Sequence, residues 1–69
     1  MNNLFKIKNI GACIVLCNYL DGAVADYENG DVDNILLIED CIATLKMLGD
    51  VSWLHYSKRM DKAEKINDW

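Results

Sequence analysis

The side chains of this sequence best suited to chemistry are three cysteines and one histidine. Cys13 and Cys17 stand four residues apart, which places two thiols on one face of a helix. With Cys41 and His55 they would complete a Cys₃His ligand set, a common composition of structural zinc sites. Zinc sites usually contain two closely spaced ligand pairs in loops, whereas this sequence has one pair, set in an apolar run. Free cysteine commonly packs as a small hydrophobic side chain, so we interpret the cysteines as core residues and expect neither a metal nor another cofactor.

Catalysis by the histidine is the next alternative. General acid–base catalysis needs a carboxylate or nucleophile held against His55, and no such partner stands near it in the sequence. A phosphate-binding glycine loop, a nucleophile elbow and an HExxH helix are all absent. An EF-hand calcium loop is excluded as well, because Ala25, Tyr27 and Leu36 would stand at its first, third and twelfth ligand positions. The sequence therefore predicts a protein that is not an enzyme.

The cysteine count also bears on the cellular compartment. An odd number of cysteines without repeated spacing differs from a secreted disulfide framework and fits reduced thiols in a cytoplasmic protein. A signal peptide is the alternative, since Lys6 and Lys8 precede an apolar stretch and Ala-Val-Ala at 23–25 resembles a cleavage site. Asn18 and Asp21 interrupt that stretch, so we favour the cytoplasmic interpretation. No apolar run approaches the ~20 residues needed to cross a bilayer, and we expect no membrane partner.

The elements that must position these residues are predicted to be helices. Breaks centred on glycine, at 28–31 and 48–50, divide the chain into three segments in which apolar residues recur at steps of three and four. That spacing is typical of helices that pack on other helices. The sequence therefore predicts an all-α fold, a small three-helix antiparallel bundle in a single helical domain. Its expected parts are an N-terminal arm at 1–9 and helices near 10–27, 31–48 and 51–67. The expected core consists of Leu20, Val24, Ile35, Ile38, Ile42, Leu45, Trp53, Tyr56 and Met60.

A β-hairpin is the competing interpretation of the N-terminal part. Residues 4–8 alternate apolar and charged side chains, and Asp21-Gly22 could form a turn after a second strand at 13–20. Only Ile14 and Val15 are β-branched in that second run, which favours a helix there. Whether residues 4–8 form a short strand stays open at this point.

Size and composition together predict self-association. A 69-residue chain buries only about 60% of the surface of its unfolded form, yet 52% of this chain is hydrophobic. We therefore expect a homodimer or higher oligomer that completes the bundle. The interface should use the first or second helix, where Gly11, Gly22 and Ala25 permit close approach.

The net charge of −4 is unevenly spread along the chain. Residues 1–20 hold two lysines and no acid, whereas residues 21–50 hold eight acids and one lysine. An acidic middle repels phosphates, so nucleic acid is not an expected partner. The expected partner is another protein with a basic surface, contacted through four acids: Asp26, Glu28, Asp31 and Asp33.

These observations predict a small acidic binding protein, a regulator or inhibitor that acts by protein–protein interaction. The alternative function is an oligomeric binder of a small anionic ligand such as a nucleotide, held by Trp53, Tyr56, Arg59 and Lys62. Aromatic side chains beside arginine are the usual composition of an interaction hot spot. The chain resembles small accessory proteins of phages and mobile elements in being short, acidic and free of proline, but it shares no sequence motif with them.

Overall fold

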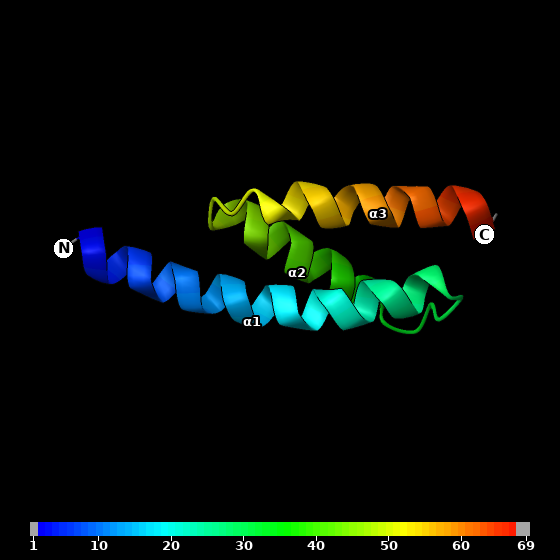
Figure 1. Cartoon of the computed structure of the whole chain (residues 1–69), viewed down its shortest axis with the longest axis horizontal. Helices are drawn as coiled ribbons and strands as arrows, with labels where there is room; N and C mark the ends of the chain where they lie inside the picture. Colours follow the sequence, from blue (N-terminus) through cyan, green and yellow to red (C-terminus); the bar gives the residue numbers. More distant parts are fainter. Residues whose placement is uncertain (1, 68–69) are drawn as a thin grey trace.

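The computed structural model describes residues 2–67, with the side chains of residues 10–66. It contains α1 (Asn2–Glu28), α2 (Ile35–Met47) and α3 (Ser52–Asn67), and residues 2–67 include no strand. Each helix packs against the other two. In Figure 1, α1 and α3 follow the long axis of the molecule, and α2 crosses obliquely between them from the end of α1 to the start of α3. The prediction of an all-helical fold built from three packed helices is confirmed.

The boundaries of the first two helices differ from the expected ones. Residues 2–9 belong to α1, where an arm or a strand at 4–8 was considered. Alternation over five residues is a weak signal, and no glycine or proline precedes Gly11 to stop a helix from extending to Asn2. The second helix begins at Ile35 instead of 31, because Asp31 and Asp33 form a turn in which the Asp31 carboxylate accepts the Asp33 amide at 3.0 Å.

Glycines follow the ends of α1 and α2, at the two breaks predicted from the sequence at 28–31 and 48–50. Gly30 (φ 104°) and Gly49 (φ 81°) adopt the left-handed conformation that lacks a steric penalty only for glycine. After α2, the amide of Asp50 donates to the Leu45 carbonyl at 3.0 Å and the amide of Gly49 donates to the Lys46 carbonyl at 3.1 Å. This pair of hydrogen bonds is the Schellman arrangement, which satisfies carbonyls that the end of a helix leaves unpaired.

The core lies where all three helices meet. Its buried side chains are Leu20, Ala23, Val24, Tyr27, Ile38, Leu45, Tyr56 and Ala63. The expected core residues Ile35, Ile42, Trp53 and Met60 are half-buried and pack against this cluster. Cys13, Cys17 and Cys41 are free thiols that pack against the same cluster, also half-buried.

The molecule is elongated because α1 is much longer than the other helices. Its radius of gyration is 13.1 Å, against about 11 Å for a compact domain of 69 residues, and its extents are 47 × 16 × 15 Å. At 1.5 Å per residue the 27 residues of α1 span about 40 Å. Within residues 2–67, no helix combines the length and the hydropathy that a bilayer-spanning segment needs.

Candidate binding surfaces

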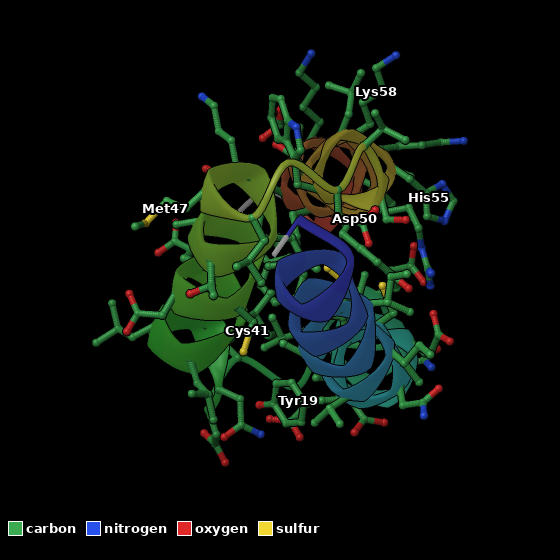
Figure 2. The ribbon with its side chains drawn as sticks, turned by 90° about the vertical axis from the view of Figure 1, so that its left-hand side faces the viewer. Tyr19, Cys41, Met47, Asp50, His55 and Lys58 are labelled. Atoms are coloured by element: carbon green, nitrogen blue, oxygen red, sulfur yellow. The ribbon has the colours of Figure 1, made fainter. Side chains whose placement is uncertain are left out.

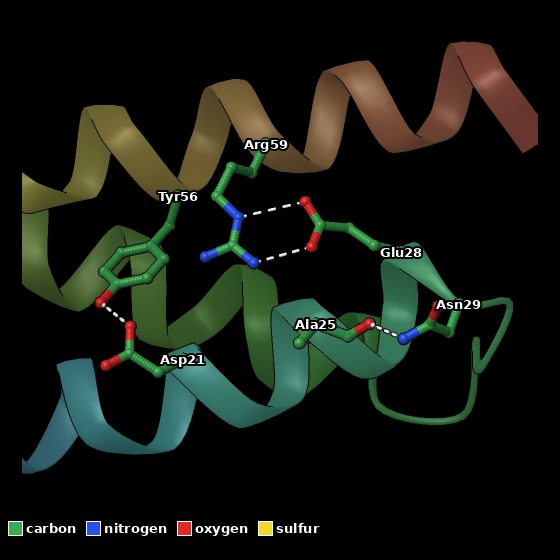
Figure 3. A network of polar contacts seen from close by, with 6 residues as sticks. All are labelled: Asp21, Ala25, Glu28, Asn29, Tyr56 and Arg59. Carbon is green, nitrogen blue, oxygen red and sulfur yellow. Dashed lines mark hydrogen bonds and ion pairs between the residues drawn. The ribbon is translucent and has the colours of Figure 1, made fainter.

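Two polar contacts fix α3 against α1 (Figure 3). The hydroxyl of Tyr56 donates to Asp21 Oδ1 at 2.6 Å and lies 3.3 Å from the carbonyl oxygen of Cys17. Farther along, Arg59 donates from Nε at 3.1 Å and from Nη2 at 2.7 Å to the two carboxylate oxygens of Glu28. This bidentate geometry fixes the relative orientation of the guanidinium and the carboxylate, in addition to the attraction between their charges. The two contacts therefore set the register of α3 on α1.

The pKa directions agree with this geometry. Burial, and then the hydrogen bond to Asp21, raises the pKa of Tyr56 far above its usual value. The hydrogen bond from Arg59 lowers the pKa of Glu28, and the same bond raises the pKa of Arg59. At neutral pH the phenol is therefore a neutral hydrogen-bond donor, and the Arg59–Glu28 pair is fully ionised.

The four acids expected to contact a partner lie at the end of α1 and in the connection to α2. Asp26, Asp31 and Asp33 are exposed and make no ion pair with any residue in 10–66. Glu28 is also exposed, but its charge is opposed by Arg59. The structure thus assigns one member of the expected acidic set to an intramolecular contact and leaves three carboxylates accessible.

Apolar side chains are exposed beside these carboxylates. Val32 stands between Asp31 and Asp33, and Leu36 in the first turn of α2 is 79% exposed. α1 and α3 cover one side of α2 and leave Leu36 exposed on another. We define the acidic loop surface as Asp26, Asp31, Val32, Asp33 and Leu36.

The four residues expected to hold an anion stand at intervals of three along α3: Trp53, Tyr56, Arg59 and Lys62. Three helical residues turn about 300°, so nine residues place Trp53 and Lys62 on opposite faces of the helix. The hydroxyl of buried Tyr56 is bonded to Asp21, and the guanidinium of Arg59 to Glu28. The structure therefore does not bring these four residues into one site.

A cavity of about 460 Å³ between α2 and α3 lies beside Trp53. Lys46 Nζ sits 4.7 Å from the centre of the Trp53 ring, a cation–π contact. Three carboxylate residues also line this cavity: Glu39, Asp61 and Glu64. A negative lining repels an anion, so this cavity does not replace the dispersed anion site.

The cysteines and the histidine do not gather either. Figure 2 shows Cys41 on α2 and His55 on the outer side of α3, on different sides of the molecule. Among residues whose side chains are described, no three of the types His, Cys, Asp and Glu meet as a metal site. Burial, followed by the hydrogen bond to Asp50, raises the pKa of Cys13, and burial raises that of Cys41. Both thiols are therefore protonated at neutral pH.

A second surface, which the sequence did not single out, is a groove beside the N-terminal half of α1. Its volume is about 510 Å³. We call it the α1 groove, and it is lined by Ile10, Cys13, Ile14, Cys17 and Asn18 of α1 and by Leu48, Gly49 and Asp50 after α2. The step of three and four residues from Ile10 to Cys17 indicates an apolar helix face in the sequence, but which part of that face the other helices cover depends on the tertiary structure.

No protein-family model matches this chain, and no curated protein or solved structure is significantly similar to it.

Proposed function

We propose that this chain is a small non-enzymatic binding protein, a regulator or inhibitor that docks onto another protein with a basic surface. The acidic loop surface carries this proposal. There Val32 and Leu36 are exposed among carboxylates that no cation opposes within residues 10–66. Protein interfaces commonly combine an apolar centre with a polar rim, and opposite charge steers the partner into place.

The surroundings of this surface support the same role. The Asp31–Asp33 turn and the left-handed Gly30 shape the backbone of the connection before a partner binds. Preorganisation lowers the entropic cost of association. Within this proposal the three helices form an antiparallel bundle that presents the connection at one end. A cytoplasmic location suits three free cysteines.

The test removes the charges without removing the turn. We use a triple variant with Asp26→Asn, Asp31→Asn and Asp33→Asn. Asparagine at position 31 keeps a side-chain carbonyl oxygen that can accept the hydrogen bond from the amide of residue 33. Proteins captured by the wild-type chain from lysate are purified, and their dissociation constants for wild type and variant are measured by calorimetry. We expect the triple variant to weaken a true partner by at least about tenfold, because three rim charges are lost.

The matched control removes three exposed acids that line the cavity between α2 and α3, by Glu39→Gln, Asp61→Asn and Glu64→Gln. This control changes the net charge equally and should retain the partner. A partner that binds all three proteins with equal affinity would contradict the proposed surface.

The same material tests the anionic-ligand alternative. Nucleotides are screened by thermal shift against the wild type and Lys62→Gln. We expect no shift, because Arg59 is engaged by Glu28 and the residues of the expected site are dispersed along α3. A rise of several degrees that Lys62→Gln abolishes would replace the regulator proposal with ligand binding.

A further inference from the structure

The N-terminal half of α1 extends beyond the part of the molecule where the three helices meet (Figure 1). The buried residues of α1 begin at Leu20, and none of the side chains at 10–19 is buried. The chain exposes 5044 Å² of surface, whereas an average monomer of 7.9 kDa exposes about 4,400 Å². The excess is about 600 Å², which is a large uncovered area for so small a chain.

The uncovered face of α1 continues the face that packs on α3. Ile14, Asp21 and Glu28 are spaced by seven residues, two helical turns, so they form one row along α1. Asp21 and Glu28 bond to α3, while Ile14 precedes the reach of α3 and is 55% exposed. Ile10, one turn earlier, is 59% exposed. The row is thus polar where α3 covers it, and it is apolar at Ile14, which the described residues leave exposed.

We propose that a second copy of this chain occupies the α1 groove. The N-terminal halves of the two α1 helices pair in antiparallel direction about a twofold axis, so that Ile10 and Ile14 of each copy enter the groove of the other. A twofold interface uses the same patch twice, and this patch supplies both an apolar ridge and an apolar groove. Two copies that each buried an area equal to the excess surface of about 600 Å² would form an interface of about 1,200 Å², the lower end of the standard size.

Shape and charge both select the antiparallel direction. The bonds of Asp21 and Glu28 place α3 on the same side of α1 as the groove. Two parallel copies would therefore bring their α3 helices into the same space, whereas antiparallel copies direct them to opposite ends. In an antiparallel pairing centred near residue 12, Lys6 of one copy stands opposite position 18 of the other, one helical turn from Asp21, so opposite charges approach each other.

The first experiment measures the dimer by sedimentation equilibrium at micromolar concentration. Ile10→Gln with Ile14→Gln removes the apolar ridge, and glutamine favours a helix at least as well as isoleucine, so α1 should persist by circular dichroism. We expect a dimer for the wild type and a dissociation constant at least about 100-fold higher for the variant. The control, Val15→Gln with Met47→Gln, alters two more exposed apolar residues outside the groove and should remain dimeric.

A folded wild-type monomer at these concentrations would overturn the proposal, as would a variant that dimerises like the wild type. Small-angle scattering tests the direction. Pairing centred near residue 12 gives a maximum dimension of about 65 Å, against 47 Å for one chain, and a dimer no longer than one chain would exclude the antiparallel form.

The dimer and the proposed function fail separately. Asp26, Asp31 and Asp33 lie outside the α1 groove, so the triple asparagine variant should dimerise with nearly unchanged affinity. A loss of dimer in that variant would contradict the assigned interface, while loss of the protein partner alone would leave it intact.

Discussion

Replacing Tyr56 with phenylalanine removes one hydroxyl from a buried ring and leaves the packing of that ring in place. The hydroxyl joins α3 to α1 through Asp21 at 2.6 Å. A hydrogen bond to a charged group contributes about 1.5–3 kcal/mol to stability. Asp21 is exposed, so water can replace the lost donor, and we expect the lower end of that range, about 1.5 kcal/mol. For 69 residues, this corresponds to a fall in melting temperature of roughly 10 °C.

Tyr19 provides a matched control for this measurement. Its Oη is buried and has no hydrogen-bond partner in the described structure, and Figure 2 shows the ring at the edge of the molecule. Tyr19→Phe therefore removes an unsatisfied polar atom, and we expect no loss of stability and a gain of up to about 1 kcal/mol. Urea unfolding of both variants at one fixed protein concentration separates the effect of the bond from that of oligomerisation.

The coupling of Tyr56 to Asp21 is measured with a double-mutant cycle. Asp21→Asn, Tyr56→Phe and the double variant should give a coupling free energy of about 1 kcal/mol. Strictly additive effects, or a loss below about 0.3 kcal/mol for Tyr56→Phe, would refute the argument that this bond holds α3 on α1.

The pH dependence of the same variant has a definite sign. Burial and Asp21 raise the pKa of Tyr56, so folding favours the neutral phenol. The stabilisation is complete below the unfolded pKa of about 10 and is lost as the pH rises above it. The difference in unfolding free energy between wild type and Tyr56→Phe should therefore stay constant from neutral pH to about 9 and shrink above 10.

Three further outcomes follow from the backbone, the core and the ion pair, each measured by chemical unfolding. Gly49→Ala should lower the free energy of unfolding by about 1 kcal/mol, because φ is 81° at that position. Gly22→Ala should raise it by about 1 kcal/mol, because the residue lies inside α1 and the added methyl group meets no atom within 4 Å. Effects of the same sign in the two variants would contradict the left-handed conformation of Gly49. Leu45→Ala removes a fully buried side chain and should cost about 3 kcal/mol, and a loss under 1 would show a core looser than described. Glu28→Gln should cost at most about 0.5 kcal/mol, because the ion pair is partly exposed. Since Arg59 lowers the pKa of Glu28, this contribution is present above the unfolded pKa of about 4.3 and is lost as the pH falls through the lower folded pKa. A difference that does not shrink as the pH falls below the unfolded pKa would refute the pairing.

The apolar periodicity and the glycine breaks were enough to determine the helical fold. A step of three and four residues places Leu20 and Val24 on one face of α1, and Ile38 and Leu45 on one face of α2, whatever the rest of the chain does. Gly30 and Gly49 mark the helix ends because only glycine adopts a left-handed conformation without strain. The spacing of apolar residues and the conformational freedom of glycine depend only on residues that are close in the sequence, so both can be recognised without the tertiary structure.

The start of α1 could not be located in the same way. Residues 4–8 satisfy the alternation of a strand and also lack any residue that breaks a helix. Short segments of this kind take their conformation from what adjoins them, and here they continue a helix that packs on α2 and α3 farther along.

The allocation of charged side chains was decided by tertiary structure alone. Glu28 and Arg59 were assigned from the sequence to two different binding sites, yet they bind each other across 31 positions of the chain. Tyr56, expected in a ligand site, is bonded to Asp21 across 35 positions. Pairs this distant depend on where α3 lies along α1, and that register depends on the lengths of both connections and on the fit of the whole core. The α1 groove also depends on tertiary structure. It exists because α1 is longer than the helices that pack against it, so part of α1 stays uncovered.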